Sequence, residues 1–215
     1  MQFGGEVERG WVAPRIAEEF PGLAISWVVA EGGKRRSPEA VRLRLRDLSD
    51  RFYGSHAIHM RERPIPWAYR VFFRHIGLDP DETRTPVEQL ALDRLHDGAF
   101  VSNGLPDDAV TLAIAETGVA MRAFDVERIE GNLCIRDTAP GESLPNRQSD
   151  LPHGTLAIAD ERGPIEPLFG GPLSEQHGVD STTRHVLFAA IQVKDVPDVA
   201  VNEALWLASS ALESA

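Results

Sequence analysis

Apolar residues in the first half of the chain recur at intervals of three and four positions, the period of an amphipathic helix. Behind Ser37 and Pro38, an N-cap serine followed by proline at the first helical position, one such stripe is formed by Val41, Leu45, Leu48 and Phe52. Arg42 and Arg46 fall together on the opposite side of this predicted helix. The segment is therefore expected to bury one face and to expose a basic one.

The same periodicity predicts further helices over residues 12–19, 66–76, 85–96, 107–117 and 202–214. The helix over residues 66–76 is expected to bury Tyr69, Phe72, Phe73 and Ile76. Arg70 and Arg74, four positions apart, are expected to point outward. Thr85 and Glu88 have the spacing of a capping box, which marks the start of the next helix. Gly118 is placed to close the helix over residues 107–117.

Short apolar runs bounded by Gly, Pro and Asp predict strands. One is expected early, over residues 23–30, and four more follow, over residues 133–136, 156–159, 168–169 and 185–193. A helix-rich first half and a sheet-rich second half indicate the α+β class. The length of 215 residues and the absence of a convincing linker favour one domain over residues 1–215.

Composition is ordinary for a soluble globular protein, with 42% hydrophobic and 26% charged residues. No apolar run approaches the ~18 residues of a membrane span, and the first residues lack the basic-then-apolar pattern of a secretory signal. The one cysteine, Cys134, lies between apolar residues of a predicted strand and is expected to be a buried, reduced thiol. These features favour a cytoplasmic protein and leave its oligomeric state open.

The net charge of −11 argues against a general nucleic-acid-binding surface, because phosphate contacts need Lys and Arg. The charge is uneven, however, since the segment from Lys34 to His75 holds eleven Lys or Arg residues and four Asp or Glu residues. A tRNA-binding patch on an acidic body has this distribution, and its members would be Arg42, Arg46, Arg70 and Arg74. Arg-rich solvent faces of ordinary helices have the same distribution, and both interpretations stay open.

Several kinds of site lack a supporting motif. The chain has no glycine-rich nucleotide loop of the Rossmann or Walker type. His56 and His59 have metal-like spacing, but no second pair of His or Cys accompanies them, and a structural zinc site needs four ligands. Ser181 and His185 have no evident acidic partner. We therefore expect no metal and no cofactor.

Short elements follow one another in a fixed order through the second half of the chain. They are Arg74–Gly77 with Thr85-Pro86-x-Glu88, Gly118 to Asp125, the strand with Arg136, Gly141-Glu142, Ile158-Ala159-Asp160, Gly170-Gly171 and Thr182-Thr183. In this order they resemble the tRNA-editing domain of the phenylalanyl-tRNA synthetase beta subunit, formed by its third and fourth structural domains. The resemblance is clearest over residues 74–193. It implies a pocket that hydrolyses tyrosine wrongly attached to tRNA, by orienting a water and stabilising the oxyanion.

Carried over residue by residue, the resemblance implies a catalytic group made of Arg122, Gly170 and Gly171. The glycines coincide with the family's pair, where missing side chains let the backbone approach a substrate. Arg122 stands where the synthetases usually have histidine before Ala-Phe-Asp. Arginine cannot serve as a general base near neutral pH. It can bind a carboxylate, a phosphate or an oxyanion, or form a structural ion pair with Asp125 or Glu127.

The substrate contacts that the resemblance implies are Thr111, Asp125 and Phe188. Thr111, or Val110 with a one-residue slip, falls where the family has asparagine. Asp125 coincides with the aspartate of Ala-Phe-Asp, a position that also suits a cap at a strand edge. Phe188 falls where the synthetases carry the glutamate that recognises the tyrosine hydroxyl, and phenylalanine cannot accept a hydrogen bond. These residues argue for a retained pocket without the tyrosine-reading chemistry.

Different functions remain in view. A free-standing editing protein would bind aminoacyl-tRNA and hydrolyse a mischarged amino acid in trans, relying on a positioned water rather than a side-chain base. A catalytically inactive module on the same fold would bind an amino acid, a small metabolite or a protein partner. An enzyme of another specificity is a third option, because a fold does not determine a function.

Overall fold

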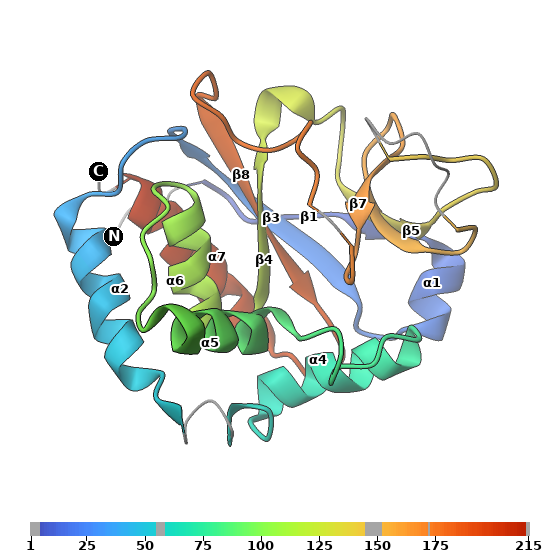
Figure 1. The fold of residues 1–215 in the computed structure, drawn as a ribbon. Coiled ribbons are helices and arrows are strands. Elements are labelled where there is room, and N and C mark those ends of the chain that lie inside the picture. Colours follow the sequence, from blue (N-terminus) through green and yellow to red (C-terminus); the bar gives the residue numbers. More distant parts are fainter. Residues whose placement is uncertain (1–4, 55–58, 145–151, 172, 214–215) are drawn as a thin grey trace.

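The computed structural model describes residues 5–54, 59–144, 152–171 and 173–213, and in it helices pack against two four-stranded sheets (Figure 1). The first sheet has the strand order β1-β3-β8-β4 and the second the order β2-β5-β6-β7. Strands near both ends of the chain share the first sheet, since β3 pairs with β8. The structure is the single α+β domain that the sequence predicts.

The centre of the first sheet is an antiparallel pair of apolar strands, β3 (Ala24–Glu31) and β8 (His185–Gln192). Most of their residues are buried, because both faces of the sheet are covered. The edge strands are β1 (Glu8–Arg9) and β4 (Ala120–Asp125), both antiparallel to their neighbours. The β4 edge is important for the site, because no further strand of the described residues lies beside it.

The second sheet consists of β2 (Trp11–Val12), β5 (Cys134–Asp137), β6 (Leu156–Ala159) and β7 (Pro164–Pro167). Cys134 is buried on β5, as predicted. The prediction of a strand over residues 168–169 is wrong. The strand in this region is β7, which ends at Pro167. Prolines at both ends of β7 argue against a strand in sequence, but they are tolerated here because β7 is an edge strand with one neighbour.

Helices cover the first sheet and one end of the second (Figure 1). They are α1 (Pro14–Glu19), α2 (Glu39–Arg51), α4 (Pro64–His75), α5 (Pro86–Asp97), α6 (Asp107–Thr117) and α7 (Asp198–Glu213), with a 3-10 turn, η1, at Val126–Arg128. α6 and α7 pack on each other and on the first sheet, and α2 packs on the outer side of α6. None of the helices in the described ranges is long and apolar enough to cross a membrane.

α4 is joined to the first sheet through Tyr69. The Tyr69 hydroxyl donates to the carbonyl oxygen of Ile191 (2.5 Å) and accepts from the N–H of Ala120 (3.0 Å). Burial raises the pKa of Tyr69 above its ordinary value, so the hydroxyl keeps its proton and remains a donor. One turn along the same helix, the ring of Phe73 lies 4.7 Å from that of Phe169, between centroids. α4 therefore positions both β4 and the segment that follows β7.

Arg70 does not point outward as predicted. Its side chain is buried, and its guanidinium donates to Glu88 (Nη1–Oε1 2.8 Å) and to Asp81 (Nη2–Oδ1 2.7 Å). The turn that holds Asp81 folds back over α4, so tertiary structure covers a position that helical periodicity places in solvent. Arg74, one turn later, is exposed and lies over the ring of Trp67 at 5.6 Å.

The two predicted helix starts have different outcomes. Thr85 and Glu88 form the predicted capping box, with the Thr85 N–H donating to Glu88 Oε2 (3.3 Å). Ser37 makes no cap, because its hydroxyl donates instead to Oδ2 of Asp108 (2.6 Å) at the start of α6. The buried Asp108 carboxylate thus ties the beginning of α6 to the beginning of α2.

Candidate functional site

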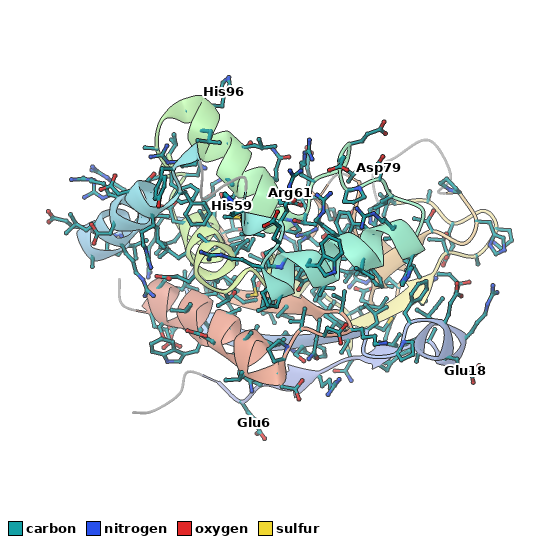
Figure 2. The ribbon with its side chains drawn as sticks, turned by 90° about the horizontal axis from the view of Figure 1, so that it is seen from below. Glu6, Glu18, His59, Arg61, Asp79 and His96 are labelled. Atoms are coloured by element: carbon teal, nitrogen blue, oxygen red, sulfur yellow. The ribbon has the colours of Figure 1, made fainter. Side chains whose placement is uncertain are left out.

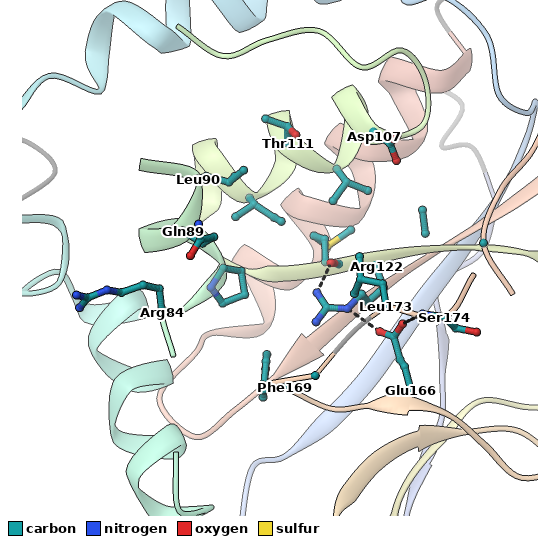
Figure 3. Close-up of a pocket in the computed structure, with 18 of the residues that line it drawn as sticks. Arg84, Gln89, Leu90, Asp107, Thr111, Arg122, Glu166, Phe169, Leu173 and Ser174 are labelled. Carbon is teal, nitrogen blue, oxygen red and sulfur yellow. Dashed lines mark hydrogen bonds and ion pairs between the residues drawn. The ribbon is translucent and has the colours of Figure 1, made fainter. Parts of the chain in front are cut away.

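A cleft of about 770 Å³ opens beside the free edge of β4 (Figure 3). α5 and α6 line one side, and β7 with residues 169–171 and 173–174 lines the other. Most lining residues are apolar, and the polar or charged ones among them include Arg84, Gln89, Asp107, Thr111, Arg122, Glu166 and Ser174. An apolar cavity of this size with a few polar groups suits a small organic ligand.

Arg122 is held in the cleft by a buried carboxylate. Its Nε donates to Oε1 of Glu166 (2.7 Å), and its Nη1 donates to the carbonyl oxygen of Met121 (2.9 Å), as the dashed lines in Figure 3 show. Glu166 is 1% exposed and its other oxygen accepts from the N–H of Ser174 (2.9 Å). Among the described residues Nη2 of Arg122 has no partner. The guanidinium is therefore fixed in place with one nitrogen left for a ligand.

The glycine pair is required by packing inside the protein. Gly170 has φ of 73°, and an added Cβ would lie 3.0 Å from the side chain of Leu78. At Gly171 an added Cβ would lie 2.5 Å from Pro167. This differs from the expectation that missing side chains make room for a substrate. The N–H groups of both glycines have no acceptor among the described residues, so both can donate to a ligand.

Asp107 supplies a carboxylate at the start of α6, on the lining of the cleft. Within the described part of the chain it forms neither an ion pair nor a hydrogen bond. Asp107 is exposed at the rim, yet partial desolvation by the surrounding protein raises the pKa of its carboxyl above the ordinary value, and nearby Lys34 opposes this shift. A carboxylate with a raised pKa and no partner can accept a proton from a bound water.

The structure brings together four of the residues that the sequence nominates, Thr111, Arg122, Gly170 and Gly171. Phe188 does not join them, because it is fully buried in β8, opposite Ala123 of β4. It packs in the core beneath the cleft, where a residue reading a ligand's hydroxyl would have to be exposed. A glutamate at this buried position would need a partner for its charge, and phenylalanine needs none.

Asp125 also lies outside the cleft lining. It is 3% exposed at the end of β4, and its carboxylate accepts from the Thr183 hydroxyl (2.7 Å) and from the N–H of Glu127 (3.0 Å). Arg128 adds an ion pair, with Nε 3.2 Å from Oδ2 of Asp125. With these three partners Asp125 joins the end of β4 to the beginning of β8.

Only some residues of the predicted basic patch lie on the surface. Arg70 is removed from it by its internal ion pairs, while Arg46 and Arg74 are exposed and Arg42 is half-buried. α2, which carries Arg42 and Arg46, lies on the far side of α6 from β4 (Figure 1). Around α4 the surface carries both signs of charge, as Arg61 and Asp79 show in the view from below (Figure 2). His56 lies outside the described residues.

Sequence reasoning missed Glu166 and Asp107. Glu166 lies in a short apolar strand with a proline at each end. Because buried carboxylates are nearly always paired, a single carboxylate in such a run predicts a basic partner from elsewhere in the chain. Asp107 precedes Asp108 at a helix start, where an acidic pair is ordinary capping chemistry. Only the packing of α6 beside β4 places it at the cleft.

Replacing Gly171 with alanine is expected to lower the free energy of unfolding by about 1–3 kcal/mol, the usual cost of forcing an extra carbon into a packed position. The added Cβ would overlap Pro167 and push the segment after β7. Denaturant unfolding monitored by circular dichroism measures the change. Gly54→Ala is the matched control, since no described residue lies within 4 Å of its added Cβ. Equal stability of the two variants would contradict the packing role.

Comparison with known families gives a match over the cleft region. The family model described as the B3/4 domain matches residues 68–200, a span that includes α5, α6, β4, β7 and β8. All the residues that line the cleft fall within this span. The family assignment therefore rests on the part of the chain that forms the site.

Curated relatives are beta subunits of phenylalanine–tRNA ligase. That of Streptomyces avermitilis is 33% identical over 119 residues, which covers 53% of this chain and 14% of the relative. The Yersinia pestis subunit is 36% identical over 85 residues, covering 37% of this chain and 10% of the relative, so the chain spans only a small part of the proteins it matches. The family model matches more than half of the residues of this chain. The chain therefore belongs to the B3/4 domain family, and in this region it is similar to the phenylalanine–tRNA ligase beta subunit.

Proposed function

We propose that the cleft binds the aminoacyl end of a tRNA and that the protein hydrolyses a mischarged amino acid in trans, in the cytoplasm. The observation that carries this proposal is the convergence of Thr111, Arg122 and Gly170-Gly171, far apart in sequence, on one cleft. Membership of the B3/4 family and similarity to subunits of a tRNA ligase support it.

Hydrolysis of an aminoacyl ester needs a water that attacks the carbonyl carbon and donors for the oxygen that becomes negative. The donors available in the cleft are Nη2 of Arg122 and the N–H groups of Gly170 and Gly171. Asp107 takes a proton from the attacking water, and the free hydroxyl of the terminal ribose can hydrogen-bond to that water and orient it. Asp107 then returns the proton to the ribose oxygen as the ester C–O bond breaks, and the free amino acid is released.

A catalytically inactive binding module is the second candidate. It is favoured by the ion pair between Arg122 and Glu166, because a guanidinium bonded to a buried carboxylate has less charge to offer an oxyanion. In that case the cleft would bind a free amino acid or a small metabolite, with the ligand's carboxylate on Nη2 of Arg122. A protein partner would occupy the same cleft through a carboxylate-bearing segment.

A deacylation panel separates the two candidates. The purified protein is incubated at micromolar concentration with tRNAs carrying correct and incorrect amino acids, and the released amino acid is measured. We expect at least one mischarged tRNA to be hydrolysed above the uncatalysed rate, with the correctly charged forms spared. Absence of any acceleration across the panel would eliminate the editing enzyme. Calorimetric titration with free amino acids would then test the binding module directly.

A further inference from the structure

A second cavity, of about 620 Å³, adjoins the cleft at the glycine pair. α1, the end of α4 and residues 152–156 form its walls, and Phe169, Gly170 and Gly171 line both this cavity and the cleft. The two spaces therefore border each other along the segment that follows β7. A ligand whose two parts are joined by one ester can place one part in each space.

The second cavity holds polar side chains without partners. Arg15, Glu19, His75 and Asp137 line it, and within the described residues none of the four makes a side-chain hydrogen bond or an ion pair. Unpaired groups of both signs facing one cavity favour a ligand with donors and acceptors over a highly charged anion.

His153 adds an acceptor with a defined direction. Its Nδ1 lies 2.9 Å from the carbonyl oxygen of Thr138. A carbonyl oxygen only accepts, so Nδ1 carries a proton, and in the neutral ring Nε2 is left as an acceptor. Apolar surface from Phe20 and Leu78 completes the lining, and both residues are half-buried. Such a combination of apolar surface, hydrogen-bond acceptors and one arginine matches a nucleoside with a single phosphate.

We propose that this second cavity binds the terminal nucleoside of the RNA whose aminoacyl ester occupies the cleft. The base lies against Phe20 and Leu78, the ribose lies over Gly170-Gly171, and Arg15 contacts the phosphate that precedes the nucleoside. This inference rests on the proposed function, because the ester link is what places a nucleoside next to the cleft. It moves the RNA contact from α2 to the side of the molecule that carries α1 and α4 (Figure 1).

The position of the cavity beside the cleft favours this side over α2. Arg44 and Arg51 of α2 are paired with Glu116 of α6, at 3.4 and 3.0 Å, which reduces the charge that α2 offers to phosphate. α6 also stands between α2 and β4. Arg15, in contrast, lines a cavity that borders the cleft.

The test compares a tRNA with a complete 3′ end and the same tRNA lacking its terminal nucleotide, by filter binding to the wild type, Arg15→Glu and Arg9→Glu. Arg9→Glu is the matched control, an exposed arginine on β1 with the same change of charge. We expect the wild type to bind the complete tRNA about tenfold more tightly than the trimmed one, a typical effect of one stacked base. Arg15→Glu should bring this ratio close to one, and Arg9→Glu should leave it unchanged.

A wild-type ratio of one, or a ratio that survives Arg15→Glu, overturns the inference even if the protein deacylates tRNA. If the protein binds no tRNA, the proposed function fails, and adenosine 5′-monophosphate then tests the cavity alone. Binding in the cavity shifts the imidazole NMR resonances of His75 and His153, which both line it. Unshifted resonances at saturating nucleotide overturn the nucleoside site.

Discussion

Replacing Arg70 with alanine is expected to lower the free energy of unfolding by about 3–5 kcal/mol, the cost of breaking a buried ion pair by removing one partner. The Arg70 side chain is 4% exposed and that of Glu88 is 9% exposed, so the variant leaves a carboxylate in the interior without its counterion. Two carboxylates hold Arg70, and despite the opposing effect of burial they raise the pKa of its guanidinium above the ordinary value. Urea unfolding curves measure the loss.

The matched control for this prediction is Arg74→Ala, one turn along α4. Arg74 is exposed and lies over the ring of Trp67. Its replacement should lower the free energy of unfolding by no more than about 1 kcal/mol. A second variant, Arg70→Met with Glu88→Gln, should be more stable than Arg70→Met alone, because glutamine removes the buried charge and can still serve in the capping box. Equal losses for Arg70→Ala and Arg74→Ala would contradict the structural role of the pair.

Arg122→Lys is expected to reduce the rate of aminoacyl-tRNA hydrolysis by about 10²–10³-fold, the usual effect of losing one oxyanion donor. Lysine keeps a positive charge beside Glu166, which avoids leaving that buried carboxylate unpaired. The arginine guanidinium donates to Glu166 and to the Met121 carbonyl and still offers a further N–H in a fixed plane. The lysine ammonium has no such planar set of donors. Single-turnover deacylation of the best substrate from the panel measures the change.

Arg84→Lys is the control for the cleft, because Arg84 also lines it but is bonded to Pro80 and Asp81 at the rim. We expect its rate to stay within about threefold of the wild type, as for a surface substitution. Unfolding curves for both variants establish that the fold is intact. If Arg122→Lys hydrolyses as fast as the wild type, the arginine is a structural partner of Glu166, and the donors must be the backbone N–H groups alone.

Local sequence patterns predicted the elements whose stability is local. The stripe on α2, the capping box at Thr85, the αL glycine at Gly118 and the apolar strand β3 are all present, with boundaries shifted by one or two residues. In each, a repeat or a cap within about a dozen residues specifies the backbone. The strands β1, β2, β4 and β7 were not predicted. All four are edge strands, which are specified by pairing with a neighbour in the sheet rather than by a continuous buried apolar run.

The sequence by itself determined the α+β class, the family resemblance and the nomination of Arg122, Thr111 and the glycine pair, because periodicity, glycine and ordered motifs are properties of the chain. Only the tertiary structure decided what those residues touch. It buried Arg70 beneath a turn, placed Phe188 in the core, paired Arg122 with a carboxylate 44 positions away, and opened a second cavity beside the glycines. Ion pairs and cavities are made by segments far apart in the chain, and no local pattern of polar and apolar residues encodes which of them meet.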